Sequence, residues 1–199
     1  MKSKRLLSAL LTVVLVVTLT PVNVVFAAAG EGVYVNTITS PLDLTSGDVS
    51  GDGYSWDSAA NTLTLTGLCI DLAGDTSSSA IKLPNNNTTI IVEGTNKIIG
   101  GKAAIQLASG SGTFTIKGAD EENPSGNILE IKDSVVALSI NNRSTPVVWE
   151  DVTFYSETEG LAAECPYGIT FRNSDISVTA TSEKSTYGAG AAIYSRDDI

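Results

Sequence analysis

The stretch Asn61–Leu72, N-T-L-T-L-T-G-L-C-I-D-L, consists of two runs of alternating apolar and polar residues that meet at Gly67. Alternation with period two is typical of a β-strand, because successive side chains point to opposite faces. Degenerate copies of this stretch return to the end of the chain. Recurrence every few tens of residues is typical of a repeat architecture in which neighbouring repeats share one core.

The copies align on the position of Gly67. Equivalents of Leu63–Gly67 recur at intervals of 22 to 33 residues, as Ile90–Gly94, Phe114–Gly118, Val147–Asp151 and Ile169–Asn173. A second strand precedes three of these by nine residues, as Ala80–Leu83, Ala104–Leu107 and Ala137–Ile140, with weaker copies at Ala162–Cys165 and Ala192–Ser195. A third strand follows, as Leu68–Leu72, Ile98–Ile99, Ile128–Ile131, Val152–Phe154 and Ile176–Val178.

Three short strands per repeat, joined by turns rich in Gly, Asn, Ser and Asp, predict an all-β protein. The constant nine-residue step favours a right-handed single-stranded parallel β-helix, a solenoid of about five coils. The alternative is an antiparallel sandwich, which does not explain that step. Residues 30–60 then form an N-terminal cap with first strands at Val33–Val35 and Leu42–Leu44, and residues 61–199 form coils that are incomplete at the C-terminus.

The alignment also assigns side chains to faces. One inward stack is predicted to contain Leu65, Val92, Ile116, Trp149 and Phe171, beside a second of Leu63, Ile90, Phe114, Val147 and Ile169. A third inward column holds Leu83, Leu107, Ile140 and Cys165, which leaves Cys69 on another face and about four coils away, too far for a disulfide. The outward row Thr66, Glu93, Lys117, Glu150 and Arg172 is predicted to be a solvated ion-pair ladder and not a catalytic row.

Residues 1–29 are predicted to be a secretion signal. Lys2, Lys4 and Arg5 form a basic region, Leu6–Leu19 is apolar, and small residues favour cleavage after Ala27 or Ala29. The alternative, a retained membrane anchor, needs about 20 apolar residues, which is longer than this run. The protein is therefore expected to be secreted from a bacterium, with association with the cell wall as one option. After cleavage the mature chain is not expected to insert into a membrane.

Composition excludes several classes of function. The full chain has 12 basic and 22 acidic residues and a net charge of −10, so nucleic acid is not an expected partner. It has no histidine, which excludes Ser-His-Asp and Cys-His catalysis. Acidic inserts at 118–127 and 156–160 are equally consistent with binding loops and with solubility.

The segment Ser46–Asp57 contains a partial calcium-loop pattern. Asp48, Ser50, Asp52 and Gly53 match positions 1, 3, 5 and 6 of such a loop, but position 12 is Ala59 instead of an acid. A turn leading into the first repeat explains the same Gly and Asp residues. Calcium is the one cofactor that the sequence suggests, with Asp48, Asp52 and Asp57 as the candidate ligands.

The motifs Trp56-Asp57, Asn61–Gly67, Ala80-Ile-x-Leu83 and Ile90–Ile98 resemble those of a broad group of bacterial secreted β-helix proteins with a pectate-lyase-like fold. The resemblance implies a cell-surface module that binds plant or host polysaccharide, often with structural calcium. Candidate binding residues are Tyr155, Tyr167 and Tyr194. Pectate lyases stack acidic calcium ligands on one outward row, whereas the corresponding row here reads Lys82, Gln106, Ser139, Glu164 and Tyr194.

The sequence therefore predicts a non-catalytic module that is carbohydrate-binding or adhesive. Two alternatives stay open at this point: a polysaccharide lyase or hydrolase, and a purely structural surface stalk.

Overall fold

The computed structural model describes residue 34 and residues 36–85, 87–108, 111–140, 145–160, 163–164, 168–181 and 193–194. For residues 163–164 and 193–194 only the backbone is described. The predicted secretion signal, Cys165 and Tyr167 lie outside this part of the chain, and so does most of the strand expected at Val33–Val35.

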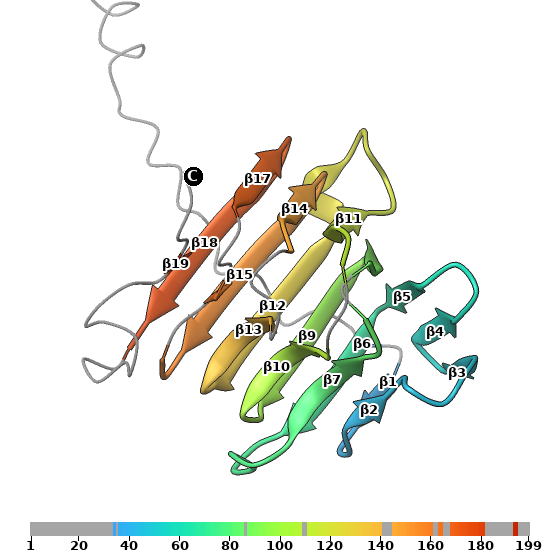
Figure 1. Ribbon diagram of the computed structural model, residues 1–199. Helices are drawn as coiled ribbons and strands as arrows, with labels where there is room; N and C mark the ends of the chain where they lie inside the picture. Colours follow the sequence, from blue (N-terminus) through green and yellow to red (C-terminus); the bar gives the residue numbers. More distant parts are fainter. Residues whose placement is uncertain are drawn as a thin grey trace, which may run out of the picture. The chain divides into compact units, whose positions relative to one another are not determined.

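The described strands form three sheets, here named A, B and C, and follow one another across Figure 1 broadly in chain order. Sheet A contains β1 (Asn36–Ile38), β6 (Leu68–Leu72), β9 (Thr95–Gly100), β12 (Ile128–Ser134), β15 (Thr153–Thr158) and β18 (Asp175–Ala180). Sheet B contains β2 (Leu42–Asp43), β7 (Ser79–Leu83), β10 (Ala103–Leu107), β13 (Val136–Ile140), β16 (Ala163–Glu164) and β19 (Ile193–Tyr194). Sheet C contains β3 (Val49–Gly51), β4 (Tyr54–Asp57), β5 (Thr62–Thr66), β8 (Thr89–Glu93), β11 (Phe114–Gly118), β14 (Val147–Glu150) and β17 (Ile169–Arg172).

From β5 onward the chain visits sheets C, A and B in constant rotation. Each strand pairs in parallel with the strand that occupies the same sheet one passage earlier, as β5 does with β8 and β6 with β9. The only helix in the described residues is a short 3-10 turn, η1 (Pro124–Gly126). The prediction of an all-β protein with parallel sheets is confirmed, and this arrangement is consistent with a β-solenoid.

Sheet B has the register that the nine-residue step predicts. Ile105 pairs with Ile81 on one side and Leu138 on the other, and Leu107 pairs with Leu83 and Ile140. All of these side chains are at most 4% exposed. In a parallel sheet each such position stacks the same kind of side chain on its neighbour, so the column forms part of one continuous core.

Sheet C departs from the predicted alignment between β8 and β11. Ile116 pairs with Ile90 and not with Val92, and Gly118 pairs with Val92, so the register is shifted by two residues. A two-residue shift keeps every side chain on its predicted face. It does break the predicted outward ladder, because Lys117 lies opposite Ile91 instead of Glu93. The other steps of that ladder, Thr66 to Glu93 and Lys117 to Glu150 to Arg172, are in register.

The reason for the shift is the position of Gly118. Unlike Gly67 and Gly94, Gly118 does not have a positive φ, and it ends a strand whose inward positions are buried. A Cβ at Gly118 would collide with the carbonyl oxygen of Asp151 and with the Asn127 side chain. The inserted residues 119–127 make the turn into sheet A instead, which leaves β11 free to take the shifted register.

At the other described turns from sheet C to sheet A, the alignment position holds a residue in the left-handed region. Gly67, Gly94, Asp151 and Asn173 have φ values of 68°, 66°, 54° and 45°. Glycine, asparagine and aspartate are the residues that adopt this conformation at least cost. The recurring Gly, Gly, Asp and Asn therefore reflect a backbone requirement of the turn.

We expect Gly94→Asn to change the free energy of unfolding by less than about 0.5 kcal/mol, because asparagine tolerates the left-handed region. Gly94→Val should cost about 1–2 kcal/mol, because a β-branched side chain does not. A Cβ at Gly94 meets no heavy atom within 4 Å, so the difference isolates backbone conformation from packing. Urea denaturation of the two variants measures it, and equal losses would contradict the explanation.

The N-terminal part of sheet C is antiparallel. β3 and β4 form a hairpin around Asp52-Gly53, and β4 pairs in the antiparallel sense with β5. Gly53 has φ +84°, and the ring of Tyr54 covers Gly51, where a Cβ would lie 2.6 Å from a ring carbon. The Gly and Asp residues of this segment thus build the turn that the sequence offered as the alternative to a calcium loop.

The aromatic residues of the inward stack have different burial. Trp149 is 2% exposed and contacts Phe154 and Phe171, with ring centroids 5.8 and 5.4 Å away. Its predicted place in the core is confirmed. Phe171 pairs with Trp149 as predicted but is 39% exposed, so its predicted burial is wrong. The reason is that β17 is the end strand of sheet C and has a described neighbour on one side only.

Candidate functional site

The outer face of sheet A carries an ordered row of polar side chains. Strand pairing places the following residues beside one another, one on each strand: Thr37, Cys69, Lys97, Glu130, Tyr155 and Ser177. They point outward because their neighbours along each strand, such as Phe154 and Ser156 around Tyr155, are buried in the core. Adjacent members of the row are separated by the strand spacing of about 4.8 Å.

Glu130 lies at the centre of a small ion-pair network on this face. Its two carboxylate oxygens contact the amines of Lys97 at 3.5 Å and of Lys132 at 2.7 Å. The Glu130 and Lys97 side chains are only 13% and 18% exposed, so neighbouring side chains cover most of this pair. The hydrogen bond to Glu130 raises the pKa of Lys132 above its ordinary value. The network orients both amines around Glu130, which lies opposite Tyr155 on the adjacent strand.

Cys69, between Thr37 and Lys97 in the same row, is a free thiol. It is 5% exposed, and this burial raises the pKa of the thiol, while the neighbouring Thr37 hydroxyl acts in the opposite direction. A raised pKa keeps a thiol protonated and unreactive, so Cys69 packs as a small apolar residue.

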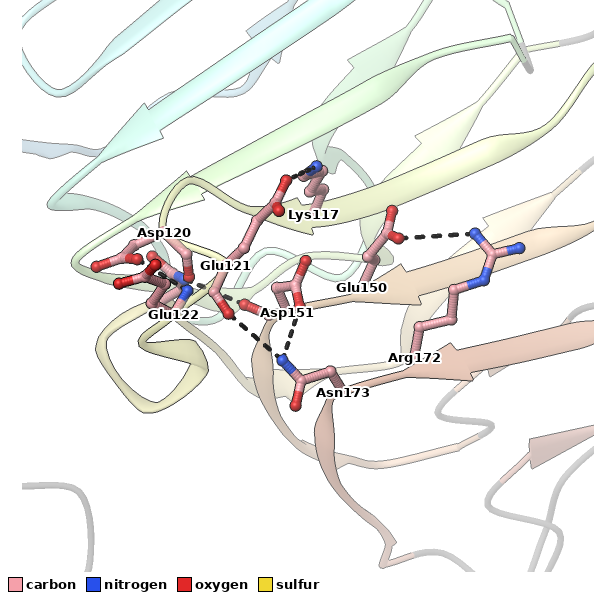
Figure 2. A network of polar contacts seen from close by, with 9 residues as sticks. Lys117, Asp120, Glu121, Glu122, Glu150, Asp151, Arg172 and Asn173 are labelled. Atoms are coloured by element: carbon pink, nitrogen blue, oxygen red, sulfur yellow. Dashed lines mark hydrogen bonds and ion pairs between the residues drawn. The ribbon is translucent and has the colours of Figure 1, made fainter.

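A second polar network lies at the turn from sheet C to sheet A (Figure 2). Glu150 pairs with Arg172 at 3.7 Å, and Lys117 pairs with Glu121 of the inserted segment at 2.7 Å, which raises the pKa of Lys117. Asn173 donates to the carboxylate of Asp151 at 2.8 Å. In Figure 2 these groups bridge neighbouring strands and the inserted turn.

Asn127 ties the inserted turn to the next strand of the network. Asn127 is 2% exposed. Its side-chain amide donates to the carbonyl oxygens of Asp120 at 2.7 Å, Asn123 at 3.3 Å and Asp151 at 3.1 Å. Asn96 has a similar role one passage earlier, where it donates to the Glu93 carbonyl and accepts from the Leu68 amide. The Asn127 amide therefore fixes the acidic insert against the Asp151 turn, and the insert's Glu121 supports the structure through its ion pair with Lys117.

Two of the three predicted calcium ligands, Asp48 and Asp57, accept hydrogen bonds from residues that follow the hairpin. Asp48 accepts hydrogen bonds from the amide and hydroxyl of Ser58, which lower its pKa, and Asp57 accepts from the amides of Ala59 and Ala60. Throughout the described part of the chain, no three Asp, Glu, Cys or His side chains are grouped to hold a metal ion. Asp48, Asp52 and Asp57 form no such group, and calcium binding by this segment stays a prediction.

Two of the three predicted tyrosines lie on strands of different sheets. Tyr155 is half-buried on the outer face of sheet A, whereas Tyr194 is in β19 of sheet B, and Tyr167 is outside the described residues. The sequence prediction missed the residues that accompany Tyr155, namely Lys97, Glu130 and Lys132. Their outward positions follow from the alternation in the third strand of each repeat, as in Leu129-Glu130-Ile131.

No helix in the described residues is long and apolar enough to span a membrane. Comparison with known proteins gave no relative: no family model, no curated protein and no solved structure matches the chain.

Proposed function

We propose that the chain is a secreted, non-catalytic module that binds polysaccharide through the outer face of sheet A. The proposal includes the finer architecture, a right-handed single-stranded parallel β-helix of about five coils that follows a cleaved signal peptide. The repeated rotation through sheets C, A and B supports this architecture. Its surfaces are long, regular rows of side chains, which suit an extended polymer better than a small molecule.

The observation that carries the proposal is the position of Tyr155. The ring lies outward in a row with Glu130 and Ser177 on the adjacent strands and with Lys97 one strand further. An aromatic ring offers an apolar face against which the C–H face of a sugar ring packs, while the hydroxyl end stays polar. The exposed Ser177 hydroxyl and the Lys132 amine, whose side chain is 42% exposed, supply partners for sugar hydroxyls beside the ring, whereas the Glu130–Lys97 pair is largely covered.

The charge of the chain favours an uncharged polymer. A net charge of −10 repels anionic polysaccharides over a Debye length of about 8 Å at physiological ionic strength. On sheet A, Glu130 pairs with Lys97 and Lys132, and Asp71 and Glu157 lie on the same face, so the face has no surplus of positive charge to attract an anionic polymer. Plant or host glycans without uronic acids are therefore the preferred candidates.

Affinity electrophoresis on a panel of neutral and anionic polysaccharides tests the proposal. We expect Tyr155→Ala to weaken binding at least tenfold, a loss of about 1.4 kcal/mol, and Tyr155→Phe to retain most of it because the ring remains. Thr64→Ala, on the outer face of sheet C, is the matched control and should bind normally.

Two outcomes would contradict the proposal. Release of unsaturated or reducing ends from any polymer would identify a lyase or hydrolase. Binding to none of them would favour a structural stalk. Amino-terminal sequencing of protein from the culture medium tests export separately, with Ala28 or Gly30 as the expected first residue.

A further inference from the structure

Two lysine amines converge on a single carboxylate on the outer face of sheet A. Lys97 on β9 and Lys132 on β12 contact the two carboxylate oxygens of Glu130 at 3.5 and 2.7 Å. The side chain of Glu130 is 13% exposed, whereas that of Lys132 is 42% exposed. The carboxylate is therefore largely covered, but a ligand that approaches from solvent can reach the Lys132 amine.

This ion-pair network adjoins the tyrosine of the proposed binding surface. Glu130 lies opposite Tyr155 on the adjacent strand, and Lys132, two residues further along β12, lies opposite Glu157. Neighbouring strands are about 4.8 Å apart, and alternate residues of one strand are about 6.6 Å apart. A sugar ring that packs on Tyr155 therefore brings its substituents close to Glu130 and to the Lys132 amine.

Glu130 already makes the contacts that the carboxylate of an acidic sugar would need. Its hydrogen bond is the largest influence on the pKa of Lys132, which it raises, and the charges of Glu157 and Asp133 act in the same direction. A uronic acid carries a carboxylate where a neutral hexose carries a hydroxymethyl group. Charge-assisted hydrogen bonds between amines and carboxylates are about twice as strong as neutral ones, so free amines here would favour a uronate. With Glu130 in place, a second carboxylate meets an amine that is already engaged and a like charge that repels it.

We infer that Glu130 is the residue that sets the selectivity of this surface for neutral over uronic-acid polysaccharides. It is a built-in carboxylate that occupies Lys97 and Lys132 and so excludes the carboxylate of an acidic sugar from the surface around Tyr155. This role presupposes the proposed binding of polysaccharide at Tyr155. Discrimination of this kind arises from a repulsive contact with the wrong ligand and needs no additional contact with the right one.

Affinity electrophoresis on matched pairs of polymers tests this role. The probes are a β-1,4-glucan, a β-1,4-mannan and a β-1,4-galactan, each in its neutral form and after oxidation of its primary hydroxyl groups to carboxylates. Glu130→Gln keeps the size of the side chain and removes its charge. We expect this variant to bind the oxidised form of the preferred polymer at least tenfold more tightly than the unmodified chain does, while its affinity for the neutral form changes less than about twofold. The gained affinity should fall as salt is added, because it depends on charge.

Three further variants separate the role of Glu130 from other effects of removing it. Glu93→Gln, at the exposed end of β8 in sheet C, removes the same charge from the chain and should bind no oxidised polymer. Lys132→Gln in the Glu130→Gln background should abolish the gain. Glu130→Gln leaves the largely covered Lys97 amine without its partner, so Lys97→Met/Glu130→Gln serves if the single variant does not fold. Lys132 remains in that double variant, which should also bind the oxidised form more tightly than the unmodified chain.

The neutral and oxidised polymers report on different claims. If the unmodified chain binds a neutral form and neither Glu130 variant gains affinity for its oxidised form, the role of Glu130 is overturned and the proposed function stands. Equal binding of the two forms by the unmodified chain would also overturn the role of Glu130. If the unmodified chain binds no neutral form, the proposed function fails, and the selectivity assigned to Glu130 fails with it.

Discussion

Replacing Trp149 by Ala is expected to lower the free energy of unfolding by about 3–5 kcal/mol, the typical cost of emptying a buried aromatic site. Trp149 is 2% exposed, and its ring contacts those of Phe154 and Phe171. The cavity would open on β14, which is paired with β11 on one side and β17 on the other, so strands on both sides limit relaxation. Urea denaturation of both proteins measures the loss.

Two controls separate burial from other roles of this strand. Trp149→Phe should cost much less than the alanine variant, because most of the ring remains and the buried indole N–H, which has no described partner, is removed. Glu150→Ala removes a partly exposed partner of Arg172 and should cost less than about 1 kcal/mol. A larger loss for Glu150→Ala than for Trp149→Ala would mean that the faces of β14 are exchanged.

Replacing Gly118 by Ala is expected to be the second most damaging change, with a cost of about 3 kcal/mol, at the upper end of the usual overpacking penalty. The added methyl group would collide with the Asp151 carbonyl oxygen and the Asn127 amide. Neither gives way easily, because the Asn127 amide donates to that same carbonyl and to two others. Thermal or urea unfolding measures the effect.

Gly94→Ala is the matched control for this prediction. Gly94 has the left-handed conformation that Gly118 lacks, and no heavy atom lies within 4 Å of its hypothetical Cβ. The control should therefore cost only about 1 kcal/mol of backbone strain. If Gly118→Ala were the milder change, Gly118 would be a turn residue like Gly94, and the register shift between β8 and β11 would be wrong.

The sequence predicted much of the strand arrangement because side-chain alternation and a constant step depend on local geometry. The nine-residue step from Ile81 to Ile90 is such a case, and it placed Leu83, Leu107 and Ile140 in one column. The third strands, from Leu68–Leu72 to Ile176–Val178, were also correctly located.

The errors in the predicted register and burial come from residues whose type fits more than one structural position. Gly118 looks like Gly67 in an alignment, but the insert that follows it changes which residue makes the turn. Phe171 has the pattern of a core residue, yet its burial depends on a neighbouring strand that alternation does not reveal. The candidate site was only partly predictable for the same reason: Tyr155 was identified, but its neighbours Glu130 and Lys97 come from other passages of the chain.

The central structural claim is that successive passages of the chain stack in parallel and in register. Cysteine pairs on the outer face of sheet B test it most directly, in a chain whose Cys69 and Cys165 are replaced by alanine. Gln106 pairs with Lys82 on one side and with Ser139 on the other, while Lys82 and Ser139 lie two strands apart. Adjacent positions about 4.8 Å apart are within the range that a disulfide spans, about 4.4–6.8 Å between Cα atoms, and positions twice as far apart are not.

Mapping of disulfides by mass spectrometry after mild oxidation is the measurement. The account predicts bonds in the Lys82→Cys/Gln106→Cys and Gln106→Cys/Ser139→Cys variants and none in the Lys82→Cys/Ser139→Cys variant. A disulfide in the Lys82→Cys/Ser139→Cys variant would contradict the order of the strands in the sheet. The lack of a disulfide in both of the other variants would contradict it as well.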